Sequence, residues 1–161
     1  CISYPRNGKD TFERIKIVNS RRAKSNTFAI QESNFYEQSD IVVSSLKNSE
    51  NDIEKLIYIC CILNSKLIYH WLYHRGKRKG NMLELFQQPL KNIPIKFCDS
   101  KLYTRILNIG KKLRADNKNE NLENELNILI DKLYNLSFLE VKLIDPEFPL
   151  TQEEYDNYEI N

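Results

Sequence analysis

The fold is decided by residues 63–86, which read LNSKLIYHWLYHRGKRKGNMLELF. This stretch couples an apolar helix to a cationic loop that is flanked by Gly76 and Gly80. Four of the five residues from Arg75 to Lys79 are basic and none is acidic, so the loop carries a local positive field. Because glycine lets a backbone bend closely around a partner, the stretch predicts a surface that grips phosphates.

Upstream of this stretch, three short runs predict the strands of a small sheet. Residues 12–19, 27–32 and 40–45 are β-branched or aromatic and are bounded by Asn, Ser, Asp and Gly. Apolar residues then recur at helical spacing from Asn51, a good N-cap, until Asn64 and Ser65 interrupt the pattern. We therefore expect two abutting helices, the second capped by Ser65.

Downstream, prolines and a second periodic pattern set the expected elements. Residues 81–86 and 93–97 lie around Pro89 and Pro94 and are expected to be extended. Helices are expected over residues 99–113, 122–133 and 137–144, the second antiparallel to the first. The tail after Pro146 lacks periodicity and is expected to wrap the domain without forming an element. The predicted fold class is α+β, with a small, mostly antiparallel sheet packed with helices and followed by a C-terminal helical hairpin. Its expected parts are a basic α+β recognition part (1–100), a helical hairpin closing the same domain (101–145) and an acidic tail (146–161).

Composition indicates one domain with an uneven charge distribution. The chain has 161 residues, enough to bury a core without disulfides, and its net charge is only +2. Residues 1–100 hold 16 Lys and Arg against 10 Asp and Glu, whereas residues 101–161 hold 8 against 12. A surface that faces a polyanion should therefore lie in the first hundred residues.

Cysteine usage and hydropathy predict a soluble, cytoplasmic protein. The four cysteines form no C-x-x-C spacing and are expected to be reduced thiols. The longest apolar run, residues 56–63, is too short to cross a bilayer. Since the chain begins at Cys1 and its only methionine is Met82, we expect it to be a piece of a longer polypeptide.

Several separate segments, in the same order, resemble the C-terminal specificity domain of TaqI-like adenine-specific DNA methyltransferases and related type II restriction-modification enzymes. The likeness covers residues 12–145 and rests on several motifs rather than one. The segments that carry it are RRAKSNTFA (21–29), SDIVV (39–43), LNSKL (63–67), HRGKRKGNMLEL (74–85), PLKNIPI (89–95) and IDKLYNL (130–136).

The resemblance implies a domain that recognises a sequence in double-stranded DNA and works beside an N-terminal methyltransferase domain of the same polypeptide. It implies that S-adenosylmethionine binds in that missing domain, with magnesium only if the parent enzyme also cleaves DNA, and that this chain holds no cofactor. The chain has neither a glycine-bearing strand-turn-helix for a methyl donor nor an Asn/Asp-Pro-Pro-aromatic element for a flipped base. Alone, it is not expected to catalyse.

The candidate DNA-binding residues combine cations with amides, which suit phosphates and base edges. Two glycines are expected to shape the loop backbone. Aromatic residues 69, 71 and 73 are expected to belong to the core, with stacking on bases as the alternative. The alternative for the cations is a solvated turn or an exposed polar hairpin. The candidates are Arg21, Arg22, Lys24, Asn26, Arg75, Lys77, Arg78, Lys79 and Gln87, with Gly76 and Gly80 for the backbone.

Other functions remain open at this point. His70 and His74 are four apart, but the metalloprotease helix needs Glu after the first His and Trp71 stands there, so no metal site is expected. Asp131 with Glu140 and Lys142 superficially matches the Asp and E-x-K residues that hold magnesium in many restriction nucleases. That pattern needs E-x-K on a strand, whereas residues 137–144 are expected to form a capped helix. A further alternative is a protein-interaction module in which the helices of 51–74 and 101–161 contact a partner.

Overall fold

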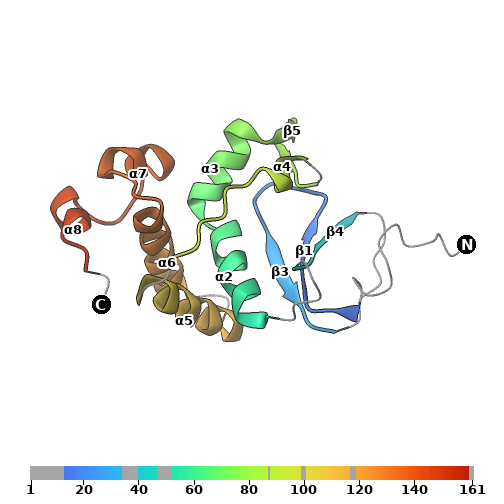
Figure 1. The fold of residues 1–161 in the computed structure, drawn as a ribbon. Helices are drawn as coiled ribbons and strands as arrows, with labels where there is room; N and C mark the ends of the chain where they lie inside the picture. Colours follow the sequence, from blue (N-terminus) through green and yellow to red (C-terminus); the bar gives the residue numbers. More distant parts are fainter. Residues whose placement is uncertain are drawn as a thin grey trace, which may run out of the picture.

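The computed structural model describes residues 13–33, 40–46, 52–86, 88–98, 101–116 and 119–159. Over these residues two small sheets lie beside a set of helices (Figure 1), which confirms the α+β class. The strands are β1 (Lys16–Ser20), β2 (Arg22–Ala23), β3 (Phe28–Gln31), β4 (Ile41–Ser44), β5 (Lys77–Lys79) and β6 (Met82–Glu84). The helices are α2 (Ile53–Leu63), α3 (Lys66–Arg75), α4 (Gln88–Lys91), α5 (Lys101–Ala115), α6 (Glu120–Leu133), α7 (Phe138–Ile144) and α8 (Gln152–Asp156).

The first sheet has the order β3-β1-β4 and is antiparallel throughout. β3 and β4 lie within two of the runs predicted from the sequence, whereas β1 begins only at Lys16, because residues 13–15 of the first run are not in a strand. Ile17 on β1 lies opposite Ile30 on β3 and Ser44 on β4, and Ile17 and Phe28 are buried. This sheet therefore supplies one wall of the core.

The second sheet, with the order β2-β6-β5, was not predicted. β6 pairs antiparallel with both neighbours. The cationic stretch expected to be a loop is in fact strand β5, because Lys77–Lys79 forms a hairpin with Met82–Glu84. β2 is only two residues long, too short for periodicity to reveal. The two sheets are joined where the Leu85 N–H donates to the Arg21 carbonyl and the buried Asn19 Nδ2 donates to the Leu85 carbonyl, both at 2.9 Å.

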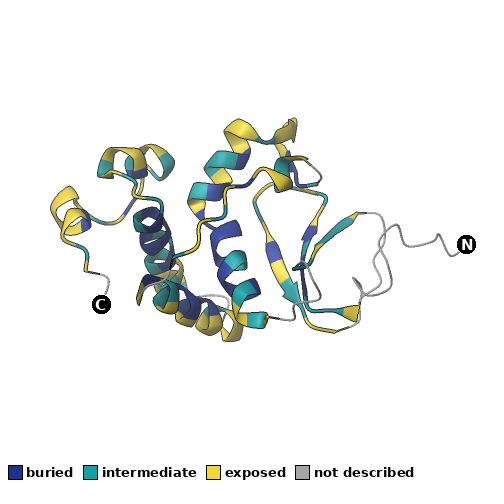
Figure 2. Cartoon of the chain, viewed as in Figure 1, coloured by how far each residue is buried: buried dark blue, intermediate teal, exposed yellow. Residues whose placement is uncertain are grey.

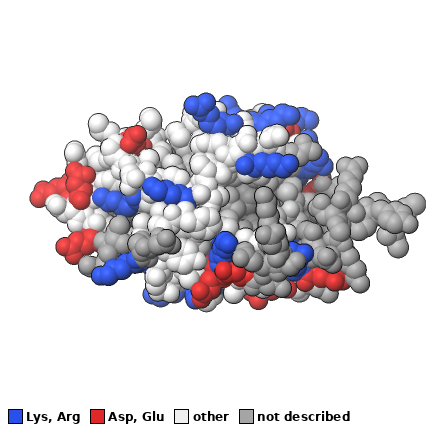
Figure 3. All heavy atoms as spheres, viewed as in Figure 1, with Lys and Arg blue, Asp and Glu red and all other residues white. Residues whose placement is uncertain are grey.

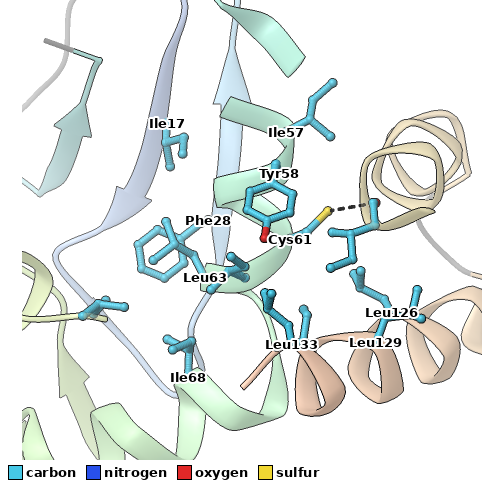
Figure 4. Close-up of a cluster of buried hydrophobic side chains, with 14 of the residues drawn as sticks. Ile17, Phe28, Ile57, Tyr58, Cys61, Leu63, Ile68, Leu126, Leu129 and Leu133 are labelled. Carbon is cyan, nitrogen blue, oxygen red and sulfur yellow. Dashed lines mark hydrogen bonds between the residues drawn. The ribbon is translucent and has the colours of Figure 1, made fainter. Parts of the chain in front are cut away.

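Helix α2 is the centre of the molecule. It packs on the first sheet on one side and on α5 on the other, and nearly every turn is buried (Figures 2 and 4). Its N-cap is Asp52, whose side chain accepts from the Lys55 N–H, and not Asn51, which lies outside the described residues. On α5, a Cβ at Gly110 would lie 2.5 Å from Cys61 Sγ, so glycine is what lets the two helices approach this closely.

The break between α2 and α3 is held to the start of β3 by side-chain amides. Ser65 caps α3 as predicted, accepting from the Ile68 N–H. Asn64 exchanges two hydrogen bonds with the backbone of Phe28, and Asn26 Nδ2 donates to the carbonyls of Leu63 and Ser65. The predicted interruption is therefore the joint that fixes α3 relative to the first sheet.

The C-terminal helices pack beyond α2. α5 and α6 form the predicted helical hairpin, and α7 begins at the predicted cap, Ser137, with a capping box to Glu140. The tail after Pro146 does form an element, contrary to expectation. α8 is capped by Thr151, and Phe148 and Tyr155 are buried against Val141 and Ile128. Five residues are too few for a helical period to show in the sequence.

Among the described residues, no single helix is long and apolar enough to span a membrane. α2 and α3 together reach that length and apolarity, but they are bent by 63° at the break between them. The cysteines that the structure describes, Cys60, Cys61 and Cys98, are free thiols.

Candidate nucleic-acid interface

The basic hairpin is built directly on the end of α3. The Gly76 N–H closes the helix by donating to the Leu72 carbonyl at 3.0 Å, and a Cβ at Gly76 would lie 2.3 Å from that carbonyl oxygen. At the other end, Gly80 has φ 61° in the two-residue turn, a backbone conformation that residues with a side chain rarely adopt. The two predicted glycines thus fix the start and the tip of the hairpin.

One face of this sheet presents cations around a buried carboxylate. Arg22 on β2 and Lys77 on β5 both lie opposite Glu84 on β6. The Arg22 Nε is 3.4 Å from Glu84 Oε1 and the Lys77 Nζ is 3.6 Å from Oε2. The side chain of Glu84 is 9% exposed, whereas those of Arg22 and Lys77 are 49% and 71% exposed. Glu84 therefore draws two cations from separate strands together and leaves their outer atoms open to a partner.

The opposite face carries Leu83, which is buried in the core, and Arg78, which lies opposite it in the register. The Arg78 guanidinium lies over the ring of Tyr73 on α3, with its carbon 3.9 Å from the ring centroid. Tyr73 and Tyr69 are exposed, so the prediction that they belong to the core is wrong; only Trp71 is half-buried against the core. α3 buries Ile68 and Leu72 instead, which turns the two tyrosines outward beside the hairpin.

The remaining predicted residues are distributed around the same sheet. Arg21, just before β2, stacks on Phe86 with its guanidinium carbon 4.4 Å from the ring centroid. Arg75, Lys79 and Lys24 are exposed. Figure 3 shows Lys and Arg gathered over the end of α3 and around β5, while acidic residues lie at the opposite end, over α8, and along the lower edge of this view.

One predicted residue, Asn26, stands apart from this cluster, and another is not described. Asn26 lies at the α2–α3 break, where its amide donates to the carbonyls of Leu63 and Ser65 at 2.7 and 3.0 Å. Both of its donor hydrogens are thereby used within the fold, so only its carbonyl oxygen remains for a partner. Gln87 lies outside the described residues.

The described residues assemble neither the alternative metal site nor the alternative nuclease site. Within the described ranges, no group of three His, Cys, Asp or Glu residues could hold a metal ion. His70 lies 4.4 Å from His74 between ring centroids, and partial burial together with that neighbour lowers the pKa of His70. Glu140 and Lys142 lie on helix α7 and not on a strand, and the Glu140 carboxylate is taken up by the capping box.

Sequence reasoning missed Glu84 and the roles of Tyr73 and Phe86. The segment from Met82 to Leu85 alternates apolar and acidic residues only once, too short a signal to assign a buried face. The Arg78–Tyr73 contact depends on which face of β5 meets α3, which is set by the register of the hairpin, and the Arg21–Phe86 contact depends on the pairing of β2 with β6.

Comparisons with known proteins identify the family. Residues 3–95 match the model of the TaqI-like C-terminal specificity domain, a span that contains both sheets and the basic hairpin. The chain is 34% identical over 97 residues to the type II methyltransferase M.HincII of Haemophilus influenzae, covering 56% of this chain and 19% of that protein. It is likewise 34% identical over 97 residues to the type II methyltransferase M.HindII of H. influenzae strain Rd, covering 56% of this chain and 18% of that protein. The chain thus matches about a fifth of the length of these relatives, and it belongs to the family of TaqI-like C-terminal specificity domains.

Proposed function

We propose that this chain binds double-stranded DNA through the β2-β6-β5 sheet and reads part of a target sequence. The observation that carries the proposal is the concentration of Arg22, Lys77, Arg78 and Lys79 on one three-stranded sheet that projects from the end of α3. A β-ribbon fits the major groove of B-DNA, where each base pair presents a distinct set of donors and acceptors. The family membership and the names of the two relatives support a role in DNA methylation.

The roles of the cations follow from how each is held. Lys77 and Lys79 are exposed point charges on flexible stems, suited to phosphates. Arg22 uses only its Nε within the described structure, so its two terminal nitrogens are open to a bidentate contact. Asn26 becomes a weaker candidate because its donors are occupied. Gln87 stays a prediction.

We further propose that a methyltransferase domain of the same polypeptide, using S-adenosylmethionine, modifies an adenine that this domain brings into register. The matched part of each relative is under a fifth of its length, which leaves room for such a domain. Extruding one base for modification requires a duplex held at a fixed position. If the parent also cleaves DNA, magnesium would be needed there.

Salt-dependent binding tests DNA recognition. The double variant Lys77→Ala/Lys79→Ala should weaken binding to any duplex and reduce the slope of log affinity against log salt by about 0.9 for each phosphate that is no longer neutralised. The matched control is Lys101→Ala/Lys112→Ala, which removes the same charge from exposed positions on α5. Equal slopes for the two double variants would contradict the assigned interface.

A segment exchange tests recognition within the whole enzyme. Replacing residues 12–100 with the matching segment of a relative should move methylation to the donor's site, as mapped over a genome. If the methylated sequence follows the rest of the polypeptide instead, recognition does not lie in this chain.

The protein-interaction alternative is favoured by one observation. Leu139 and Leu143 lie one turn apart on α7 and are 78% and 72% exposed, and both lie beyond the residues that match the family. A wild-type chain that binds no duplex at low salt would favour this alternative over DNA recognition.

A further inference from the structure

Arg78 differs from the other cations of the hairpin in how it is held. Its guanidinium lies over the Tyr73 ring at 3.9 Å, and within the described residues it makes no hydrogen bond or ion pair. Lys77 and Lys79 lie one residue away on the other face of β5, and neither stacks on a ring among the described residues. Arg78 therefore has its guanidinium placed over a ring, while its five N–H donors make no hydrogen bond within the described residues.

The ring beneath Arg78 is itself well supported. Tyr73 touches Tyr69 and His74, with ring centroids 6.1 and 5.2 Å apart. The helix that carries these rings is anchored by Ile68 and Leu72, each 1% exposed. Tyr73 thus presents its ring to the guanidinium from a helix that is anchored in the core.

A stacked, planar arginine suits one kind of partner better than others. The forked donors of a guanidinium match the O6 and N7 acceptors of guanine in the major groove. A lysine ammonium offers no fixed plane and is adequate for phosphate. Loss of rotamer freedom on binding is also smaller for a side chain that is already held in place.

From this geometry we propose that Arg78 is a specificity-determining residue that contacts a guanine edge, and that Tyr73 is a positioning residue that orients it. This inference rests on the proposed function of DNA recognition. It assigns to Tyr73 a role in base discrimination and to the neighbouring lysines the phosphate contacts.

The test begins with a pool of random-sequence duplexes from which the wild-type chain selects its preferred sites. The readout is the ratio of affinities for the selected duplex and for a scrambled duplex of equal composition. Tyr73→Leu should lower this ratio by about 5- to 150-fold, the range for one bidentate base contact. Arg78→Lys, which keeps the charge and loses the fork, should lower it similarly and relax the same base position in a repeated selection.

Two further variants separate positioning from damage to the fold. Tyr73→Phe keeps the ring under Arg78 and should retain most of the discrimination. Leu139→Ala removes an exposed apolar side chain from α7, away from the hairpin, and it should keep the wild-type ratio. Helicity measured by circular dichroism should be the same in all variants.

The inference is overturned if Tyr73→Leu or Arg78→Lys selects the same site as the wild type and has an affinity ratio within about twofold of it. Such a change would be smaller than the loss of one base contact. It is also overturned if wild-type chain binds duplexes with no base preference. A wild-type chain that binds no duplex at all contradicts the proposed function itself, which separates the two failures.

Discussion

Asn64 and Phe28 are joined by a reciprocal pair of hydrogen bonds. The Asn64 Oδ1 accepts from the Phe28 N–H at 2.8 Å, and the Asn64 Nδ2 donates to the Phe28 carbonyl at 2.9 Å. A side-chain amide thus occupies the place that a neighbouring strand would take beside β3. Because Asn64 also terminates α2, this pair sets where α3, and with it the basic hairpin, leaves the core.

Replacing Asn64 with Ala should lower the free energy of unfolding by about 1 to 3 kcal/mol, because the Phe28 N–H loses its partner and the Phe28 carbonyl keeps only the weak Cys60 thiol donor. Urea unfolding would measure the change. Asn64→Asp keeps the acceptor but loses the donor, and it should also lower the free energy of unfolding. The matched control is Asn108→Ala, at an exposed position on α5; an Asn64→Ala effect no larger than this control would show that the joint contributes nothing.

The approach of α2 to α5 predicts an unusual response at Gly110. In an ordinary helix, Gly→Ala stabilises by about 1 kcal/mol. Here the added methyl would lie 2.5 Å from Cys61 Sγ and 2.7 Å from Ile57 Cγ2, so Gly110→Ala should destabilise by about 1 to 3 kcal/mol.

A double-mutant cycle separates this clash from a helix effect. Cys61→Ala should partly rescue Gly110→Ala, because it removes the closest atom that the methyl meets. Additive effects of the two substitutions would contradict a direct clash between these positions.

The parts of the fold that the sequence predicts are those with a local signal. The strands of the first sheet, the break at Asn64 and the caps Ser65 and Ser137 each depend on residues close in the chain. The second sheet depends on pairing between Arg22 and Glu84, which are 62 residues apart, and no local pattern reports such a contact. The short helix α8 was missed for a different reason. Its five residues are too few to show a helical period, and it is held in place by the burial of Tyr155.

The candidate site was predicted in composition but not in geometry. The cluster of cations is visible in the sequence because neighbouring residues carry the same charge. Which of them stacks on Tyr73 and which pairs with Glu84 follows from the alternation of side chains along β5 and β6. That alternation could be assigned only once Lys77–Lys79 was known to be a strand.

The two glycines of the hairpin should respond differently to substitution. A side chain at Gly76 meets the Leu72 carbonyl, whereas one at Gly80 meets open space but must adopt φ 61°. Gly76→Ala should therefore disturb the end of α3, and Gly80→Asn should be tolerated better than Gly80→Val, because Asn accepts positive φ. Thermal unfolding and DNA affinity of the three variants would test this order, and an equal response to Asn and Val at position 80 would contradict it.

Stability should depend on pH through Asp131. This carboxyl on α6 is 5% exposed, and burial together with Asp145 raises its pKa to about 7, while Lys66 opposes the shift. Because the folded state holds the proton more tightly than the unfolded state, stability should fall as pH rises from about 4 to about 7, by at most about 1.4 kcal/mol per pH unit from this group.

The substitution Asp131→Asn isolates that contribution. The variant keeps the shape of the side chain and removes its charge, so its stability relative to the wild type should grow with pH across this window and level off above it. Urea unfolding at a series of pH values gives the difference. A difference that is constant with pH would mean that Asp131 does not titrate in this range.

Glu84 should limit the affinity of the chain for DNA of any sequence. Its carboxylate lies within 3.6 Å of Lys77 and 3.4 Å of Arg22, so it both draws these cations together and places a negative charge beside the phosphates they would meet. Glu84→Gln should tighten binding to a non-specific duplex and steepen its salt dependence, by up to about 0.9 for each additional phosphate that the released cations neutralise. The control is Glu54→Gln, which removes the same charge from a Lys111 pair between α2 and α5, away from the hairpin. If both variants change affinity equally, the effect is one of net charge alone, and Glu84 has no special part in arranging the cations of the second sheet.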